Sequence, residues 1–150
     1  MYQTILVPLD GSKRAEAILN HVESIAKSND TKVFFLKVEE EPIMLGRDEV
    51  IDVEKYHEVF EKQNALSQAY LGDLQAGFHE NGIQAVTKLA FGSVVKAILN
   101  TAAETGTDLI AMATHGLSGL ARVSYGSVAA GVLQAADIPI LPIRSGDDKK

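Results

Sequence analysis

Residues 108–144 read DLIAMATHGLSGLARVSYGSVAAGVLQAADIPILPIR. Two apolar runs in this stretch, Leu109–Ala113 and Ile138–Ile143, have the length of buried strands. Between them lies a helical run of small residues, Val128–Ala136. The stretch therefore predicts a strand, a loop, a helix and a final strand.

The loop between the first strand and the helix of this stretch is rich in glycine. Gly116 and Gly119 lie within it, and Gly126-Ser127 opens the predicted helix. In such a unit the free amides of the loop and the helix N-terminus point to one place beyond the carboxyl end of the strand. That place suits an anion, most often a phosphate.

Three further runs upstream have the character of strands. Thr4–Leu9 and Lys32–Val38 are mostly apolar, which predicts strands buried on both faces. Ile83–Phe91 alternates more between apolar and polar residues, so we expect it nearer to an edge of the sheet.

Helical periodicity fills the segments between these strands. The first helix is expected to follow Ser12 as its N-cap and to close at residues 28–30. The second spans Val53 to about Phe78, and the third runs from Gly92-Ser93 to a cap at Gly106. An apolar stripe on the second helix consists of Leu66, Tyr70, Leu74 and Phe78, extended by Tyr56 and Phe60.

Five predicted strands thus alternate with four predicted helices. This order implies an α/β fold with an open parallel sheet, covered on both faces by right-handed crossovers. The length of 150 residues suits one domain, which we expect over residues 1–144, with a polar tail at 145–150. Residues 39–52 are expected to form a surface loop.

Composition limits the class of protein. Hydrophobic residues make up 46% and charged residues 23%, as in ordinary globular proteins. No apolar run approaches the roughly 20 residues of a membrane span, and the start MYQTILVPLDGS lacks the basic region of a signal peptide, so a cytoplasmic location without membrane insertion is expected. The absence of cysteine excludes disulfides and thiolate metal sites. A net charge of −6 argues against a nucleic-acid partner but not against a nucleotide.

Two loops hold the residues best suited to ligand binding. If the first and fourth strands are neighbours, residues 8–11 and 114–127 line one crevice. Asp10 would accept hydrogen bonds from ribose hydroxyls, while Gly116 and Gly126 would let the backbone approach phosphates. Amides at the helix start would come from Gly126, Ser127 and Val128.

Each of these residues also has an ordinary structural interpretation. Asp10 before Gly-Ser is a common turn residue. Gly116 and Gly119 could serve simply to shape a loop, and Ser127 could serve simply as the first residue of a helix. For His115 we favour a solvent-facing turn residue over a catalytic one.

Patterns typical of catalytic and metal-binding sites are absent. The sequence has no G-x-x-x-x-G-K-[ST], no G-x-G-x-x-G after the first strand, no G-x-S-x-G and no H-E-x-x-H. His21, His57 and His79 lie on predicted helices without partners at metal-ligand spacing, and the acidic run Glu39–Glu41 is expected to be a solvated loop. Catalytic residues and a protein metal site are therefore not indicated.

Several short motifs occur together. They are the start TILVPLDGS, Val38 at the end of the second strand, the turn Gly92-Ser93, the block DLIAMATHGLSGL, the triplet Gly126-Ser127-Val128 and the strand IPILPI. In this combination the chain resembles a single-domain universal stress protein over residues 2–144. The resemblance implies a Rossmann-like fold of the adenine nucleotide alpha hydrolase type, with strand order 3-2-1-4-5.

The ATP-binding branch of that family has the pattern Gly, two residues, Gly, nine residues, Gly, then Ser or Thr. Gly116, Gly126 and Ser127 match its last three fixed positions. Ala113 stands at the first, where the pattern has glycine. If a positive φ is needed there, alanine costs roughly 1 kcal/mol or more.

The resemblance implies a site for ATP, or for AMP or ADP, with Mg²⁺. Asp10 would hold the ribose, and the backbone of Val38 would face the adenine edge, with Pro8 and Leu9 alongside. The loop wall would come from Met112, Ala113 and Gly116, and the phosphates would be bound by Gly126–Val128. The implied contacts are Pro8, Leu9, Asp10, Val38, Met112, Ala113, Gly116, Gly126, Ser127 and Val128. The resemblance also implies a homodimer through the last strand.

Three functions remain open on the sequence. The first is a nucleotide-dependent regulatory or stress-response protein with an unidentified protein partner. The second is an interaction module of the same fold that binds no nucleotide. The third is a slow ATP hydrolase, for which Asp10, His115 and Arg122 are the nearby candidates.

Overall fold

The structure of the chain is a computed structural model that describes residues 2–39, 53–114 and 125–144. Helices and strands alternate along them as the sequence predicts. In chain order the elements are β1 (Thr4–Leu9), the 3₁₀ turn η1 (Ala15–Ile18), α1 (Leu19–Asn29), β2 (Lys32–Glu39), α2 (Val53–Glu80), β3 (Ala85–Phe91), α3 (Val94–Thr105), β4 (Leu109–Ala113), α4 (Tyr125–Ala135) and β5 (Ile140–Ile143).

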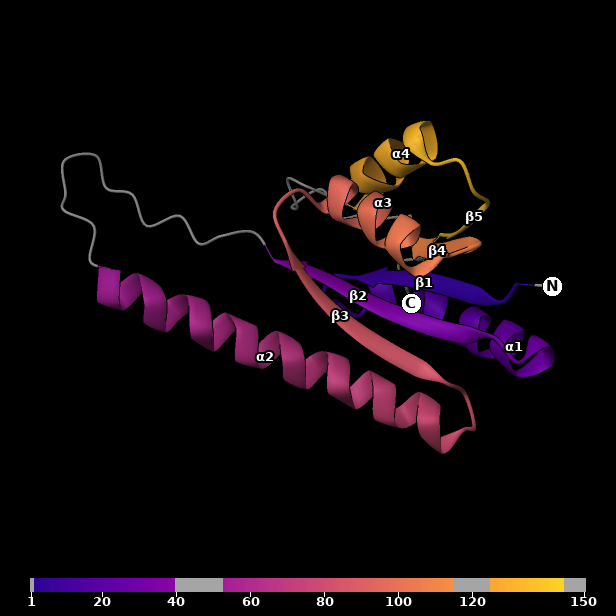
Figure 1. The fold of residues 1–150 in the computed structure, drawn as a ribbon, viewed down its shortest axis with the longest axis horizontal. Coiled ribbons are helices and arrows are strands. Elements are labelled where there is room, and N and C mark those ends of the chain that lie inside the picture. The colour runs from indigo at the N-terminus through magenta and orange to yellow at the C-terminus, as the bar shows by residue number, and fades with distance from the viewer. Residues whose placement is uncertain (1, 40–52, 115–124, 145–150) are drawn as a thin grey trace, which may run out of the picture.

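The five strands form one parallel sheet in the order β3-β2-β1-β4-β5 (Figure 1). The implied strand order and fold class are therefore confirmed, and β3 lies at an edge as its alternating pattern predicts. The chain moves outward from β1 to β3 and then returns to place β4 on the other side of β1. Strand order thus reverses between β1 and β4, which is where open α/β sheets commonly bind ligands.

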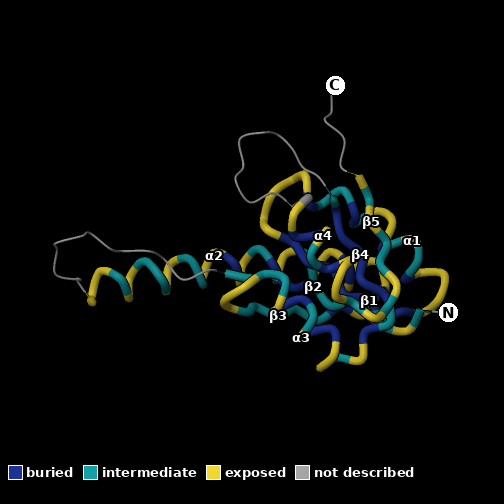
Figure 2. The backbone as a smooth tube through the Cα atoms, turned by 90° about the horizontal axis from the view of Figure 1, so that it is seen from above, coloured by how far each residue is buried: buried dark blue, intermediate teal, exposed yellow. Residues whose placement is uncertain are grey.

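Helices cover the sheet on both faces, α1 and α2 on one and α3 and α4 on the other (Figure 1). The central strands are the most deeply buried part of the chain (Figure 2). On the α1/α2 face the ring of Phe35 packs edge-on against Phe78 of α2, with centroids 4.9 Å apart. This contact anchors the carboxyl-terminal half of α2 on β2.

The helix ends follow local sequence chemistry. Asp30 and Gly106 close α1 and α3 in the left-handed conformation, and their amides donate to the carbonyls of Ala26 and Ala102. At the start of α3 the Ser93 hydroxyl accepts from the Lys96 amide. These caps confirm the predicted end of α1 and both predicted ends of α3.

The first helix begins later than the sequence suggests. Ser12 does act as a cap, because its Oγ accepts from the Ala15 amide at 3.1 Å. The chain then passes through η1 before α1 starts at Leu19. The first turn is wound more tightly than an α-helix, as is common at helix termini.

Three predicted boundaries need correction. β3 starts at Ala85 rather than Ile83, because the Ile83 amide still donates to Phe78 at the end of α2. β5 starts at Ile140 rather than Ile138. The helix α4 already contains Tyr125, so that Gly126-Ser127 lies inside the helix and does not precede it. A glycine in a helix costs only about 1 kcal/mol relative to alanine, which packing can override.

The apolar stripe predicted for α2 is wrong at Leu66, whose side chain is 66% exposed. The buried positions of α2 are instead Ser67, Leu71 and Phe78. Tyr70 and Leu74 are half-buried, in partial agreement with the predicted stripe.

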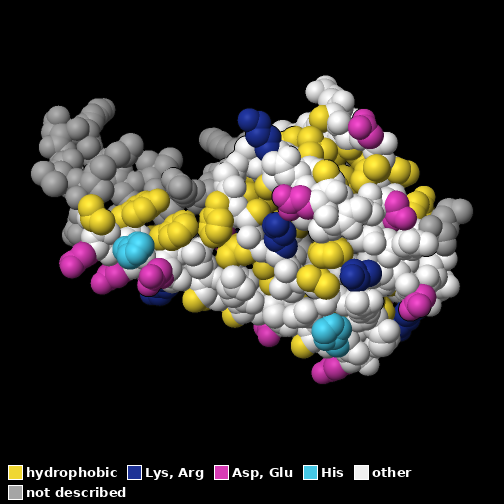
Figure 3. Space-filling model, viewed as in Figure 1, with side chains coloured by type: hydrophobic (Ala, Val, Ile, Leu, Met, Phe, Trp, Pro, Cys, Tyr) yellow, Lys and Arg dark blue, Asp and Glu magenta, His cyan; other side chains and the backbone are white. Residues whose placement is uncertain are grey.

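The amino-terminal half of α2 extends beyond the sheet (Figure 1). Hydrophobic side chains gather along it on the face seen in Figure 3. The Tyr56 ring stacks on Phe60 at 6.0 Å, Phe60 contacts Phe91 of β3 at 5.4 Å, and Val53 is 70% exposed. This half of the helix is therefore held to the body mainly through Phe91.

Candidate functional site

The carboxyl ends of β1, β2 and β4 lie side by side at one edge of the sheet (Figure 1). Leu9 at the end of β1 is opposite Lys37 of β2, and the β1–β4 register brings the ends of these two strands level. The sheet thus brings together the predicted contact residues of three strands, which are Pro8, Leu9, Val38, Met112 and Ala113.

These strand residues differ in what they can offer a ligand. The side chains of Pro8, Leu9, Met112 and Ala113 are buried, so at this edge they present mainly backbone. Val38 is half-buried and belongs to the same hydrophobic cluster as Met112. This arrangement suits a flat apolar group that lies against the strand ends.

Asp10 follows β1 directly and is exposed. Its Oδ1 accepts from the Ser12 amide at 2.8 Å, which is the turn interaction expected of an aspartate before Gly-Ser. Its Oδ2 has no hydrogen bond to any residue that the structure describes. The turn therefore fixes the carboxylate in place and leaves one oxygen to accept hydrogen bonds from a ligand.

Gly11 continues this turn with φ = +89°, a conformation that side chains rarely adopt. A Cβ there would lie 3.4 Å from Cε of Lys37. The loop after β1 thus passes closely over β2, and it requires glycine at this position.

Ala113 is the last residue of β4, is 1% exposed and pairs with Ile143. Among the described residues other than glycine, only Asp30 has a positive φ. The strain considered for alanine at the first pattern position therefore does not arise. Strand alternation directs its methyl group to the α1/α2 face, the face on which Ala111 is packed.

The predicted phosphate contacts Gly126, Ser127 and Val128 lie near the start of the described part of α4. Val128 is 5% exposed and shares a cluster with Met112, while Ser127 is exposed. The far end of α4 lines the same pocket as Ile110, which lies at the amino end of β4. Since 11 helical residues span about 16 Å, the start of α4 lies at the carboxyl edge of the sheet.

Several predicted loop residues lie outside the part of the chain that the structure describes. They are Gly116 of the contact set, and His115, Gly119 and Arg122 among the other candidates.

The sequence analysis missed a polar cluster beneath the Asp10 loop. Nζ of Lys37 and Oε2 of Glu39 form an ion pair at 2.7 Å, with side chains only 15% and 12% exposed. The Ser67 hydroxyl of α2 donates to the same Glu39 oxygen. Glu39 is therefore the half-buried last residue of β2 and not part of a solvated acidic loop. The sequence pattern could have indicated this, because Lys37 and Glu39 lie two and four residues after Phe35 and therefore on the same face of β2 as the core residues Val33 and Phe35.

A second contact joins α2 to the segment after Asp10. The Tyr70 hydroxyl donates to Oε2 of Glu16 at 2.7 Å. Burial is the main reason that the pKa of Tyr70 is raised, and the hydrogen bond to Glu16 and the charges of Glu16 and Asp10 add to it. Through Ser67, α2 thus contacts the end of β2, and through Tyr70 it contacts the turn η1 that follows the Asp10 loop.

Residues 2–39, 53–114 and 125–144 contain no group of three or more His, Cys, Asp or Glu side chains placed to hold a metal ion. Within the same ranges, no helix has the length and hydropathy of a membrane span. His21, His57 and His79 are exposed on their helices, as predicted.

Comparisons with known proteins identify the family. The sequence profile of the universal stress protein family matches residues 1–144. A universal stress protein from Staphylococcus haemolyticus is 32% identical over 154 residues, which cover 96% of this chain and 86% of that protein. The structure of the universal stress protein UspA from Lactobacillus plantarum superposes with a TM-score of 0.78 at 22% identity, over 95% of this chain and 98% of the other.

A family protein from Arabidopsis thaliana, solved with AMP bound, superposes with a TM-score of 0.69 at 20% identity, over 97% of this chain and 94% of the other. The profile match, the sequence identity and the shared fold agree with one another. The chain belongs to the universal stress protein family.

Proposed function

We propose that this protein binds ATP, or another adenine nucleotide, at the carboxyl edge of the sheet and acts as a nucleotide-dependent regulator. One observation carries the proposal. At the point where strand order reverses, the turn at Asp10 holds a carboxylate with one oxygen uncommitted among the described residues. Asp10 and the half-buried Val38 each follow one residue after the last paired residues of β1 and β2, Leu9 and Lys37. A ribose and an adenine would use these two features.

The remaining contacts follow from the position of α4. The first amides of a helix have no partner within the helix and attract negative charge. Phosphates would therefore bind at Gly126, Ser127 and Val128, with Gly116 as the further loop contact. Mg²⁺ would be held mainly by the phosphates and water, as it usually is, since the described residues offer no ligand cluster.

Related structures support an adenine ligand. The Arabidopsis protein was solved with AMP, and another universal stress protein was solved in complex with cAMP. The common part of these ligands and of ATP is adenosine monophosphate, which corresponds to the Asp10 and Val38 side of the proposed site. ATP would extend from there toward α4.

We expect Asp10→Ala to weaken ATP binding by about 1.5–3 kcal/mol, roughly 10- to 150-fold, because ribose hydroxyls would lose a charged acceptor. Isothermal titration calorimetry of wild type and variant measures this loss. Asp10→Asn is the matched control for the turn, since its side-chain oxygen can still accept from the Ser12 amide. An Asp10→Ala variant that binds as tightly as wild type would contradict the assignment.

We expect little or no turnover of ATP. Hydrolysis requires a positioned water, a base or metal, and stabilisation of the transferring phosphoryl group. Steady-state ADP release should remain well below about 1 s⁻¹, the lower end of ordinary enzymes. Faster release that is lost in His115→Ala or Arg122→Ala would instead establish the hydrolase.

The interaction module that binds no nucleotide is the second candidate. The hydrophobic side chains along the projecting half of α2 favour it, because such a surface is typical of contacts with other proteins. Mass spectrometry of small molecules released by denaturing the purified protein separates the two functions. Adenine nucleotide at near-stoichiometric amounts supports the first, and its absence together with no calorimetric response to ATP supports the second.

We also propose that the protein is a homodimer through β5. This strand is an edge of the sheet, and its side chains Ile140, Leu141 and Ile143 are only half-buried. An unpaired apolar edge favours pairing with a second copy about a two-fold axis.

A further inference from the structure

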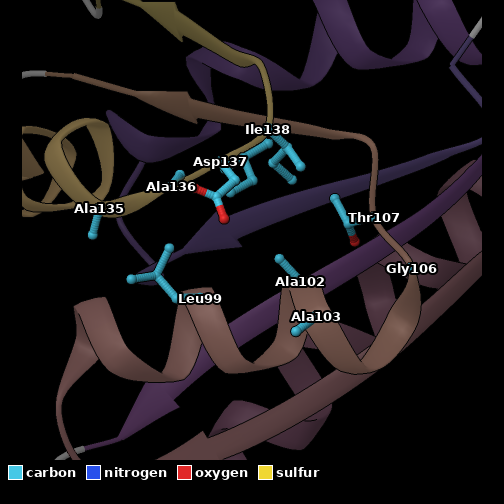
Figure 4. A pocket seen from close by; sticks show the side chains of 10 residues that line it. Leu99, Ala102, Ala103, Gly106, Thr107, Ala135, Ala136, Asp137 and Ile138 are labelled. Carbon is cyan, nitrogen blue, oxygen red and sulfur yellow. The ribbon is translucent and has the colours of Figure 1, made fainter.

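A cavity of about 350 Å³ lies at the edge of the sheet opposite to the proposed nucleotide site. It is an open pocket bordered by the carboxyl-terminal half of α3, the start of β4 and the connection from α4 to β5 (Figure 4). Its walls are mainly apolar and include Leu99, Ala102, Ile110 and Ile138. Its volume is at the lower end of the range for small-molecule pockets.

The lining offers few hydrogen-bond donors to a ligand. The amides of Gly106 and Thr107 donate to the carbonyl of Ala102. The Ile110 amide donates to Pro139, and the Ala136 amide donates to Val132. None of the described residues that line the cavity is a lysine, arginine or histidine.

The lining does offer acceptors. Thr105 donates its hydroxyl proton to the carbonyl of Thr101, so the Thr107 hydroxyl must be the donor in its 2.7 Å contact with Thr105. Thr107 therefore keeps its lone pairs for a further donor. The carboxylate of Asp137 points into the cavity (Figure 4) and has no partner among residues 2–39, 53–114 and 125–144.

Both neighbouring helices end at this cavity. Ala103 in the last turn of α3, its cap residue Gly106, and Ala135, the last residue of α4, belong to its walls. The carboxyl end of a helix carries a partial negative charge, which favours a cation. The two helix ends and the carboxylate of Asp137 thus all make the electrostatic potential in this otherwise apolar pocket negative.

We propose that this cavity is a second binding site, for a compact apolar molecule that carries a protonated amine. The amine donates to Asp137 and Thr107, and the apolar body packs between Leu99, Ala102 and Ile138. The walls select against anions, so nucleotides are not ligands of this site. The proposal does not depend on nucleotide binding at the opposite edge.

The test uses cyclohexylmethylamine and its neutral analogue cyclohexylmethanol as probes of the full chain. In ¹H–¹⁵N correlation spectra the amine should shift the amides of Thr107, Ile110 and Ile138 in a saturable way. The alcohol should bind about fivefold more weakly, the difference expected for one partly exposed charge contact. The proposal is overturned if these amides do not shift, or if both probes bind equally well.

The Asp137→Asn variant is the second part of the test, because it removes the negative charge of this exposed side chain and keeps its shape. This variant should bind both probes equally, at the affinity of the alcohol. Asp73→Asn, at an exposed position on α2, is the matched control and should keep the preference for the amine. A preference that survives in Asp137→Asn would also overturn the proposal.

Discussion

Gly126→Val is expected to abolish ATP binding, with no calorimetric heat at millimolar nucleotide. Gly126 lies next to Tyr125, the first described residue of α4, at the end of the helix that faces the carboxyl edge of the sheet. If phosphates approach the amides there, a branched side chain occupies their space. Gly126→Ala adds only one methyl group and should give an intermediate loss.

The helix itself should tolerate the change. Valine has a higher helix propensity than glycine, so Gly126→Val should not lower the melting temperature through the backbone. Gly77→Val is the matched control, since a Cβ at Gly77 of α2 would meet no atom within 4 Å. It should leave ATP affinity unchanged.

The possible outcomes distinguish a wrongly placed phosphate site from a protein that binds no nucleotide. Wild-type affinity in Gly126→Val would show that the phosphates bind elsewhere, while loss in Asp10→Ala would still support the adenosine side of the site. No heat from wild type at millimolar ATP would reject nucleotide binding as a whole and leave the interaction module.

The fold was predictable because its strongest signals are local. Apolar runs gave the bounds of β1 and β4 to the residue, and Gly106 and Asp30 marked the ends of two helices. The strand order came from the family resemblance and not from these patterns. Residues 39–52 remain largely untested, since only Glu39 of that segment is described.

The error in α2 has a geometric cause. A stripe of residues every four positions drifts by about 40° per step, because the helix has 3.6 residues per turn. Three steps separate Leu66 from Phe78, which is about 120° around the helix. The buried series Ser67, Leu71 and Phe78 uses spacings of four and seven and remains on one face.

The candidate site was predictable in part. Asp10 and Val38 lie at one edge because parallel strands share a carboxyl end, which topology alone implies. The ion pair of Lys37 with Glu39 was not predicted, because two charges on a buried face contradict the usual pattern. They are tolerated because each neutralises the other and Ser67 supplies a further hydrogen bond.

Ile140→Lys is expected to convert the proposed β5 dimer to a monomer. The carbonyls of Pro139 and Ile143 accept from β4, so alternate residues of β5 direct their backbone groups inward. Ile140 and Pro142 therefore face the open side, where the missing amide of Pro142 leaves β4 intact. Of these two residues, only Ile140 can both donate and accept a backbone hydrogen bond across the edge.

Light scattering should give about twice the 16.1 kDa chain mass, or a multiple of that dimer, for wild type. A lysine at position 140 removes half-buried apolar contact and places two like charges near the two-fold axis. Leu141→Lys should also favour monomers. Leu133→Lys is the matched control, because Leu133 is a 55% exposed residue of α4 away from the edge, and it should remain dimeric.

The Pro142→Val variant tests whether the proline allows β5 to pair with a second copy or prevents that pairing. Valine would restore an outward amide, so a dimer that already rests on Ile140 and Leu141 should be kept or strengthened. A wild type that is monomeric at tens of micromolar, and a Pro142→Val variant that dimerises, would show the opposite. In that case Pro142 prevents β5 from pairing with another chain, and it protects this edge of the sheet from association.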